Sequence, residues 1–403
     1  MRRGRNAAIA AVRPVACVIG GSMDLVRPLG LAGIPSVVVA LPGDRMRFSR
    51  FTLEAIDADG GDMLERLERF ARGQPERPVL YYQSDETLRF VSLHRDRLAP
   101  HFRFVIPGES QVETMLDKGR FADRARALML PVPRSVRLDA AQAQAGDAVD
   151  IEFPLVVKAH NRDARWLPLG TSAPGASDPS YSAKVLRVAT RVQLAALWPR
   201  LVESGLDILL QEEIPGPESS VESYHAYVDE NGRVAGEFTG RKIRTLPPLH
   251  GFSTALTSTE APDVVETGRD ILERLEFRGV AKLDFKRAPD GRLLLLEINP
   301  RFTLWNHLGA LAGVNLPALV HADLSGRPRP PAARARGGVC WCRPWKDLAA
   351  ARACGVPLGK WFPWMIRCEA NSAWAWDDPM PFVKGKLGPR ITRRVARLRR
   401  SDG

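Results

Sequence analysis

Two carboxylates and an amide near the end of the chain are of the types that bind a divalent metal. Asp284 lies in the apolar run VAKLDFKR, and Glu297 and Asn299 lie in RLLLLEINP. The Pro-Asp-Gly turn between the runs predicts that they pair as a β-hairpin. Since strand residues two apart share a face, we expect Leu296 and Ile298 to point oppositely, into a core. Such hard oxygen donors suit magnesium that bridges nucleotide phosphates, and an ordinary solvated strand face with ion pairs would use the same residue types.

Lysines accompany these groups in the sequence. Lys282 and Lys286 share the face of Asp284 on the first strand of the hairpin. Lys158 ends the apolar run FPLVVK, and Lys118 stands in MLDKGRF. A lysine in such a position either holds a phosphate as a point charge or extends its ammonium group to solvent.

The segment LLQEEIPGPE, residues 209–218, changes from an apolar strand to a polar edge and a Pro-Gly-Pro turn. Backbone groups of such a strand can bind the edge of an adenine ring, and Glu218 can accept hydrogen bonds from ribose hydroxyls. A hinge between domains with solvated acids explains the same residues, so both interpretations stay open.

The elements that must position these groups begin with a βαβ pattern. Residues 15–40 read as an apolar strand, a Gly-Gly turn, an amphipathic helix and a β-branched strand, which predicts parallel strands with a right-handed crossover. A helix at 63–70 and the strand PVLYYQ at 78–83 follow. Ser84, Asp85 and Glu86 come next, at the strand end where open α/β sheets bind ligands. A plain helix N-terminus would use the same residues.

A second unit begins near residue 111. A helix around residues 112–130 is expected to end at the Pro131 and Pro133 pair. Strands at 153–158, 183–188 and 207–214 flank a polar loop at 161–182 and a helix at 194–202. Alternating strands joined at Asn231-Gly232, a helix at 261–275 and the hairpin complete the unit. Beyond residue 327 the sequence is Trp-rich and reads as irregular.

Composition narrows the class of protein. A chain of 403 residues favours two or three domains. The net charge of +12 comes from the two ends, because residues 384–400 carry eight basic side chains and residues 1–13 carry four, without an acid. The body is therefore neutral, which disfavours a nucleic-acid reader. Five cysteines do not form an even disulfide framework, and no apolar run is long enough to span a membrane, so we expect a cytoplasmic protein.

In this order and spacing the segments resemble the ATP-grasp superfamily, and most of all its carboxylate–amine ligases. The likeness covers about residues 15–330, and KLDFKR…LLLLEINPRF is its most specific part. It implies an α/β fold, α+β in the ATP-grasp part. A Rossmann-like pre-ATP-grasp domain (1–110) is expected to precede a two-lobed ATP-grasp domain (111–330) with the nucleotide between lobes 111–210 and 215–330. A Trp-rich extension and basic tail (331–403) would follow.

The resemblance assigns the nucleotide site. Lys118 and Lys158 match the lysines that hold the ATP phosphates, and Glu218 matches the ribose ligand. The hinge strand at the adenine is matched by Gln211, Glu212 and Ile214. One departure is the loop after Lys158, which reads NRDARWLPLGTSAPG and lacks the compact Gly-rich run that covers the phosphates in many relatives.

The resemblance also assigns the reacting end. Asp284, Glu297 and Asn299 match the ligands of Mg²⁺, for which Mn²⁺ could substitute. Lys282 stands where several relatives carry an arginine facing the acyl phosphate, and a lysine keeps that charge but not the bidentate fork. Arg301, in NPRF, matches an arginine that stabilises the reacting phosphoryl or carboxylate oxygens.

The chemistry that this family implies has two steps. The γ-phosphate of ATP goes to a carboxylate, and an amine or similar nucleophile then displaces phosphate to give an amide and ADP. An ATP-grasp phosphotransferase, or a non-catalytic nucleotide-binding regulatory protein, is the alternative. The identities of the small-molecule carboxylate and amine, and the oligomeric state, are not encoded in a recognisable pattern.

Residues 236–254 are the expected substrate wall. Arg241, Lys242 and Arg244 lie near where relatives contact phosphate or an acidic substrate, and strand alternation places Lys242 and Arg244 on one face. A solvated basic strand is the alternative. His225 and His307 are expected to be structural histidines.

The C-terminal segment has two features that the likeness does not explain. Residues 389–400 place three apolar side chains on one helical stripe among arginines, which suits weak contact with an anionic membrane surface or a disordered solubilising tail. The aromatic residues before it are expected to pack the extension onto the body: Trp361, Phe362, Trp364, Trp374 and Trp376.

Overall fold

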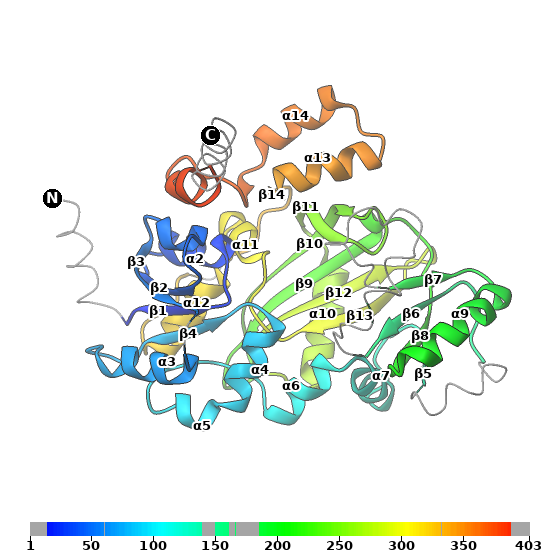
Figure 1. The fold of residues 1–403 in the computed structure, drawn as a ribbon, viewed down its shortest axis with the longest axis horizontal. Coiled ribbons are helices and arrows are strands. Elements are labelled where there is room, and N and C mark those ends of the chain that lie inside the picture. Colours follow the sequence, from blue (N-terminus) through cyan, green and yellow to red (C-terminus); the bar gives the residue numbers. More distant parts are fainter. Residues whose placement is uncertain are drawn as a thin grey trace, which may run out of the picture.

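The computed structural model describes residues 14–59, 61–138, 150–160, 166, 185–331 and 333–387. It contains a parallel sheet at the N-terminal end, a large sheet in the middle and a small sheet at the opposite side (Figure 1). Within these residues no helix combines the length and the apolar character needed to cross a membrane. The predicted membrane contact of the basic tail, and the loop after Lys158 apart from Trp166, lie outside the described residues.

The N-terminal sheet has the strand order β3-β2-β1-β4, with every pair parallel, so the predicted βαβ opening is confirmed. Strands β1 and β2 are buried along their whole length, as expected for a parallel sheet covered on both faces. The elements are β1 (Ala16–Ile19), α2 (Met23–Leu31), β2 (Ser36–Ala40), β3 (Thr52–Asp57), α3 (Met63–Arg72), β4 (Val79–Tyr82), α4 (Asp85–Leu93) and α5 (Arg95–Leu98).

The helix expected to run up to Pro131 is two helices, α6 (Glu109–Leu116) and α7 (Lys118–Ala127). Asp117 separates them because its backbone is extended, with φ −103° and ψ 115°. Its carboxylate then caps α7 by accepting a hydrogen bond from the Arg120 backbone N–H at 2.9 Å. This break makes Lys118 the first residue of a helix rather than a mid-helix residue.

The small sheet is antiparallel, with the order β5-β8-β6-β7. Its strands are β5 (Ser135–Leu138), β6 (Leu155–Ala159), β7 (Leu186–Val188) and β8 (Ile208–Glu212). Helix α9 (Arg191–Ser204) covers one face, and its Leu194 and Leu201 pack against Leu155, Val157 and Leu210. The two central strands of this sheet, β6 and β8, therefore carry Lys158 and the start of the predicted adenine hinge.

The large sheet has the order β13-β12-β9-β10-β11-β14-β15. Side chains of β9 such as Tyr224 and Ala226 pack against α10 (Pro262–Arg274) on one face. Phe238 and Trp305 pack on the other face, with α11 (Asn306–Ala312) and α12 (Leu316–Leu324). The strands are β9 (Val221–Val228), β10 (Val234–Leu246), β11 (Phe252–Thr259), β12 (Gly279–Arg287), β13 (Leu293–Asn299), β14 (Cys340–Cys342) and β15 (Ala370–Asn371).

The parallel sheet and the large sheet share one hydrophobic core. Val18, Leu25 and Tyr81 from the former pack with Leu256 and Trp341 from the latter. A continuous core of this kind holds the N-terminal unit against the large sheet. The domain boundaries at residues 110 and 330 stay a prediction.

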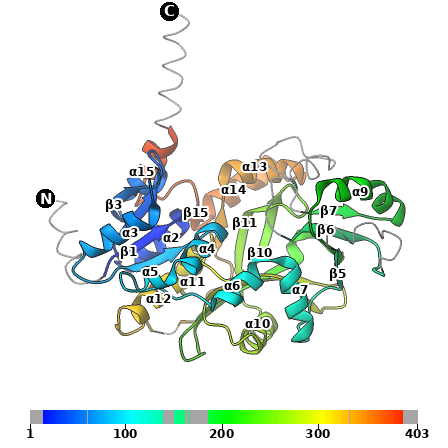
Figure 2. The same cartoon turned by 60° about the horizontal axis from the view of Figure 1, so that its bottom comes forward.

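The extension is more regular than its sequence indicates. It forms β14 and β15 at the edge of the large sheet, and helices α13 (Pro344–Ala353), α14 (Leu358–Arg367) and α15 (Met380–Phe382). Figures 1 and 2 place α13 beside β10 and β11, and α14 packs next to α13. The irregular interpretation missed the signals that bound α13, which are Pro344 at its first turn and Gly355, with φ 69°, after its end.

The aromatic residues of the extension do not all pack inward. Trp361 is buried, and Trp364 and Trp374 pack partly against the same cluster. Phe362 and Trp376 are 54% and 93% exposed, so the expected packing is wrong for these two. A hydrogen bond from the indole Nε1 of Trp361 to the Asp347 carboxylate, at 2.8 Å, holds the ring in this position.

His225 and His307 are both buried in the core, and His225 stacks on Phe238 with 4.4 Å between ring centroids. Burial lowers the pKa of His307 to about 3, and nearby Arg27 adds to that effect. Both rings are therefore neutral at physiological pH.

The low pKa of His307 predicts a loss of stability in mild acid. The unfolded chain binds a proton near pH 6.5, and the folded protein does so only near pH 3, so the stabilisation is complete above pH 6.5 and is lost as the pH falls. Between pH 7 and pH 5 this group should lower the free energy of unfolding by roughly 1–2 kcal/mol. Denaturant unfolding of His307→Gln should show a shallower pH dependence than wild type or His101→Gln. Equal slopes would contradict the assignment.

Candidate functional site

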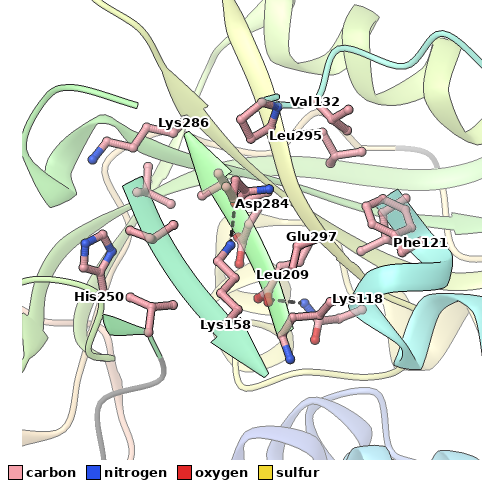
Figure 3. A pocket seen from close by; sticks show the side chains of 18 of the residues that line it. Lys118, Phe121, Val132, Lys158, Leu209, His250, Asp284, Lys286, Leu295 and Glu297 are labelled. Carbon is pink, nitrogen blue, oxygen red and sulfur yellow. Dashed lines mark hydrogen bonds between the residues drawn. The ribbon is translucent and has the colours of Figure 1, made fainter. Parts of the chain in front are cut away.

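A cavity of about 1320 Å³ lies between the small sheet and the large sheet. It exceeds the usual 300–1,000 Å³ of a single-ligand pocket, so it can hold a nucleotide and a second molecule together. Lys118, Lys158, Asp284 and Glu297 all border it (Figure 3). Of the other predicted site residues, those that line the cavity are Gln211, Glu212, Ile214, Glu218, Lys242, Lys282, Asn299 and Arg301.

The two predicted metal carboxylates stand directly opposite each other. Asp284 of β12 pairs with Glu297 of β13, and Lys282 pairs with Asn299. A register shift follows immediately, since Phe285 pairs with Leu295 and leaves Leu296 unpaired at a bulge. The expected alternation therefore holds for Ile298, which is buried, and fails for Leu296, which is half-buried and borders the cavity.

Asp284 is held from two sides. Its side chain is only 3% exposed. Oδ1 accepts a hydrogen bond from the Ser223 hydroxyl of β9, and Oδ2 accepts one from Lys282 Nζ at 2.5 Å. The opposite carboxylate, Glu297, is exposed to the cavity and accepts a hydrogen bond from Asn299 Nδ2 at 3.2 Å. The pair thus combines one fixed and one accessible carboxylate.

Arg301 links the two sheets that share the core. Its Nε donates to Asp85 Oδ1 at 2.5 Å, and its Nη2 donates to Asn299 Oδ1 at 3.0 Å. Ser84 meanwhile caps α4 by accepting a hydrogen bond from the Thr87 backbone N–H at 3.2 Å. The helix N-terminus interpretation of the Ser84–Glu86 segment is therefore confirmed, and a role of Asp85 in binding a ligand stays a prediction.

The two predicted phosphate lysines come from the small-sheet side. Lys118 Nζ donates to the carbonyls of Ala159 and His160 at 3.1 and 3.3 Å. Lys158 Nζ donates to Gln211 Oε1 at 2.6 Å, and Gln211 Nε2 donates to Ser135 Oγ at 3.0 Å. In Figure 3 both lysines point into the space beside Asp284 and Glu297. Opposite charges thus face one another across the cavity.

The predicted hinge ends in a cluster of charged groups. Glu218 is buried, and its Oε1 accepts a hydrogen bond from the His250 backbone N–H at 3.0 Å. Burial lowers the pKa of the His250 ring, against the raising effect of Glu218 and Glu213. Lys286 Nζ donates to the Gly216 carbonyl at 2.8 Å, and burial lowers its pKa as well. Lys286 therefore fixes the Pro-Gly-Pro turn in place.

Two predicted substrate residues lie outside the cavity. Arg241 is exposed and does not border it. Arg244 forms an ion pair with buried Asp347 at 2.7 Å, and its guanidinium lies 4.2 Å from the ring centroid of Trp364. A register shift between Lys242 and Arg244 turns the two side chains to opposite faces, so the expectation of a shared face was wrong.

Two lining residues, Trp305 and Arg343, were not recognised in the sequence as parts of a site. Asp85 and His250 also border the cavity. The sequence pointed to Asp85 because it follows a strand at the ligand-binding edge of a parallel sheet, and His250 lies within the expected substrate wall. For Arg343 no local pattern distinguishes it from other surface arginines. Only the pairing of β14 with β11 brings it to the site.

The donor set fits a hard divalent cation. Asp284, Glu297 and Asn299 offer carboxylate and amide oxygens. The described residues contain no group of three His, Cys, Asp or Glu side chains arranged for a metal. Mg²⁺ does not need such a cage, since it keeps several waters and binds through one or two carboxylates plus substrate phosphates. The three residues therefore fit magnesium held jointly with a nucleotide.

Sequence comparison finds one matching family and one similar protein of known activity. A family described as "ATP-grasp in the biosynthetic pathway with Ter operon" matches residues 205–341, which include β9 to β13. D-aspartate ligase of Enterococcus faecium (strain Aus0004) is 25% identical over 247 residues, or 59% of this chain. That match spans 56% of the ligase's length.

Solved structures share the fold. The biotin carboxylase domain of the 2-oxoglutarate carboxylase from Hydrogenobacter thermophilus, in complex with ADP, its magnesium salt and bicarbonate, has a TM-score of 0.57 at 15% identity. The match covers 81% of this chain and 73% of that one. L-amino acid ligase from Bacillus licheniformis gives 0.55 at 14% identity, with 77% and 74% covered. At such identities the likeness to solved structures concerns the fold alone. The family match over residues 205–341 and the distant sequence relative identify this chain as an ATP-grasp superfamily protein.

Proposed function

We propose that this protein is an ATP- and magnesium-dependent ligase that joins a carboxylate to an amine, with release of ADP and phosphate. The observation that carries the proposal is the register of β12 and β13, which sets Asp284 opposite Glu297 beside Asn299. Lys118 and Lys158 face this group from the other side of the same cavity. Acidic metal ligands and basic phosphate ligands on opposite walls suit a nucleoside triphosphate with its cation.

The nucleotide would lie with its base at the small-sheet hinge. The backbone of Glu212 and Ile214, next to Gln211, would bind the adenine edge, and Glu218 would accept hydrogen bonds from the ribose. The phosphates would then extend toward Lys118 and Lys158. The nucleotide would then lie between the lobes 111–210 and 215–330, as the resemblance to the superfamily implies.

The reaction begins with a carboxylate that is a poor electrophile at neutral pH. A carboxylate oxygen attacks the γ-phosphorus, the bond from that phosphorus to the β–γ bridging oxygen breaks, and ADP leaves. The amine then attacks the activated carbonyl, the bond from carbon to the phosphoryl oxygen breaks, and phosphate leaves with loss of a proton from nitrogen. Magnesium, when bound, neutralises phosphate charge during transfer.

The chain's own cations act on the same oxygens. Lys282 and Arg301 flank the carboxylate pair, at 2.5 Å from Asp284 and 3.0 Å from Asn299 respectively. A positive group fixed near oxygens that gain charge lowers the barrier by several kcal/mol when it is already in place. Asp85 orients Arg301 through its 2.5 Å contact, which keeps the guanidinium directed at the metal side of the cavity.

The relatives agree with this assignment. One is a D-aspartate ligase and another an L-amino acid ligase, so both join amino acids. A third was solved with the magnesium salt of ADP. These properties support an amide-forming reaction with ATP and Mg²⁺ for this chain.

Lys158→Ala is expected to weaken nucleotide binding by roughly ten- to hundredfold, because it removes a charge-assisted contact to phosphate. Its ammonium is directed into the cavity, where it donates to Gln211 Oε1, so the fold should persist. Calorimetric titration with an ATP analogue measures the change. Lys360→Ala, which removes an exposed lysine on α14, is the control. An unaltered affinity of Lys158→Ala would count against the phosphate role.

The reaction itself is tested by ADP release with panels of carboxylic acids and amines. We expect release that needs one member of each panel, together with a hydroxamate when hydroxylamine replaces the amine. Hydroxamate without any amine-dependent product would favour the phosphotransferase alternative. Nucleotide binding without ADP release from any pair would favour the regulatory alternative.

A further inference from the structure

Two basic side chains in the cavity differ from all the others. Among the described residues, nine lysine and arginine side chains line the cavity. Seven of them have a hydrogen-bond partner in the described part of the chain: Lys118, Arg126, Arg134, Lys158, Lys282, Lys286 and Arg301. For the ammonium of Lys242 and the guanidinium of Arg343, the described part of the chain supplies neither a hydrogen bond nor an ion pair. Two cations therefore face this cavity without an ion-paired or hydrogen-bonded partner among the described residues.

Both side chains rise from the same face of the large sheet. Lys242 pairs with Leu256 across β10 and β11, and Leu256 pairs with Trp341 across β11 and β14. Residues directly opposite point the same way, and Arg343 lies two residues beyond Trp341. The two backbone positions are thus two strand spacings apart across the sheet and two residues apart along it, roughly 12 Å in all, and the long side chains can reach a common group between them.

Arg343 is fixed at its base and has its charged end available. Its backbone N–H donates to the Thr254 carbonyl at 2.8 Å, and its guanidinium lies 5.6 Å from the ring centroid of Trp341. The carboxylate whose pKa responds to its charge, Asp24, is buried and accepts a hydrogen bond from the Trp341 indole at 2.7 Å. The guanidinium is therefore positioned, and its hydrogen-bond donors are not used by the fold.

We propose that Lys242 and Arg343 form a subsite for a second oxyanion on the substrate. One of the two molecules joined by this enzyme then carries a carboxylate or phosphate that does not react. This inference rests on the proposed ligase function. It assigns a binding residue to the extension beyond residue 330, which the resemblance to the superfamily does not cover.

The nucleotide does not account for these two cations. Its expected phosphate ligands, Lys118 and Lys158, come from α7 and β6, on the opposite wall. Arg343 comes from the segment between β14 and α13, on the far side of β11 from the hairpin that carries Asp284. A ligand group bound between Lys242 and Arg343 is therefore held by elements other than those that carry the phosphate lysines and the metal residues.

The test compares ligands that differ only in charge. Calorimetric titrations, with ADP and Mg²⁺ present and again without them, would use aspartate against asparagine, glutamate against glutamine, and phosphoserine against serine, in both enantiomeric forms. We expect at least one charged member to bind roughly ten- to hundredfold more tightly than its neutral partner, as for a lost hydrogen bond to a charged group. The pair that shows this effect distinguishes a carboxylate from a phosphate.

Variants locate the effect. Arg343→Gln should abolish the preference for the charged member, and Arg343→Lys, which keeps the charge without the fork, should retain part of it. Arg241→Gln removes a charge from the same sheet outside the cavity and should change nothing. A wild type without any preference, or a preference that survives in folded Arg343→Gln, would overturn the proposal. Failure of ADP and Mg²⁺ to bind in the same titrations would count against the ligase function instead.

Discussion

Glu297→Ala is expected to lower the rate of ATP turnover by about a thousandfold or more. Its carboxylate is the accessible member of the pair with Asp284, and the other acids that line the cavity lie on other elements: Asp85 at the start of α4, and Glu212, Glu213 and Glu218 at the hinge. Loss of a group that holds charge in place during phosphoryl transfer costs several kcal/mol of barrier lowering. The side chain is exposed, so the fold should persist.

The control is Glu54→Ala, which removes another exposed strand carboxylate, on β3 and far from the cavity. ADP release by this variant should equal that of wild type, and the circular dichroism and melting temperature of both variants should be unchanged. Turnover by folded Glu297→Ala at the wild-type rate would refute the metal assignment.

Asp347→Ala is expected to lower the free energy of unfolding by about 3–5 kcal/mol, because it leaves a largely buried arginine without its counter-charge. Asp347 is 0% exposed and accepts hydrogen bonds from Arg244 at 2.7 and 2.9 Å. It also accepts from the Thr254 hydroxyl and the Trp361 indole, each at 2.8 Å. This one carboxylate ties β10, β11 and α14 together.

Denaturant unfolding measures this effect, with Asp377→Ala as the control. Asp377 is half exposed and lies 4.0 Å from Arg50, so its loss should cost no more than about 1 kcal/mol. Equal midpoints for Asp347→Ala and wild type would show that Arg244 does not depend on this pair, and would reopen a role for Arg244 in binding substrate.

Local patterns in the sequence were sufficient for the hairpin that carries the metal residues. A period of two and a Pro-Asp-Gly turn bring Asp284 and Glu297 together on the paired strands of one hairpin, and the structure has that hairpin. The direct pairing of Asp284 with Glu297 depends on the bulge at Leu296. The βαβ opening was equally readable, because buried β-branched strands and a Gly-Gly turn favour one topology.

Bulges and long-range contacts could not be read in the same way. One unpaired residue in β13 turns Leu296 toward the cavity, and a register shift in β10 sends Arg244 to Asp347. Neither irregularity has a marker such as glycine at the shifted position. The contact between Arg301 and Asp85 joins residues 216 positions apart, which depends on how the two sheets share their core.

The central claim is a metal-dependent nucleotide site between Lys118, Lys158 and the Asp284–Glu297 pair. The most direct test is calorimetric titration of the full chain with a non-hydrolysable ATP analogue, with and without Mg²⁺. The account predicts binding that is strengthened by Mg²⁺ and is lost or made metal-independent in Glu297→Ala. Absence of binding at millimolar nucleotide, or binding that is equal with and without the metal, would contradict it.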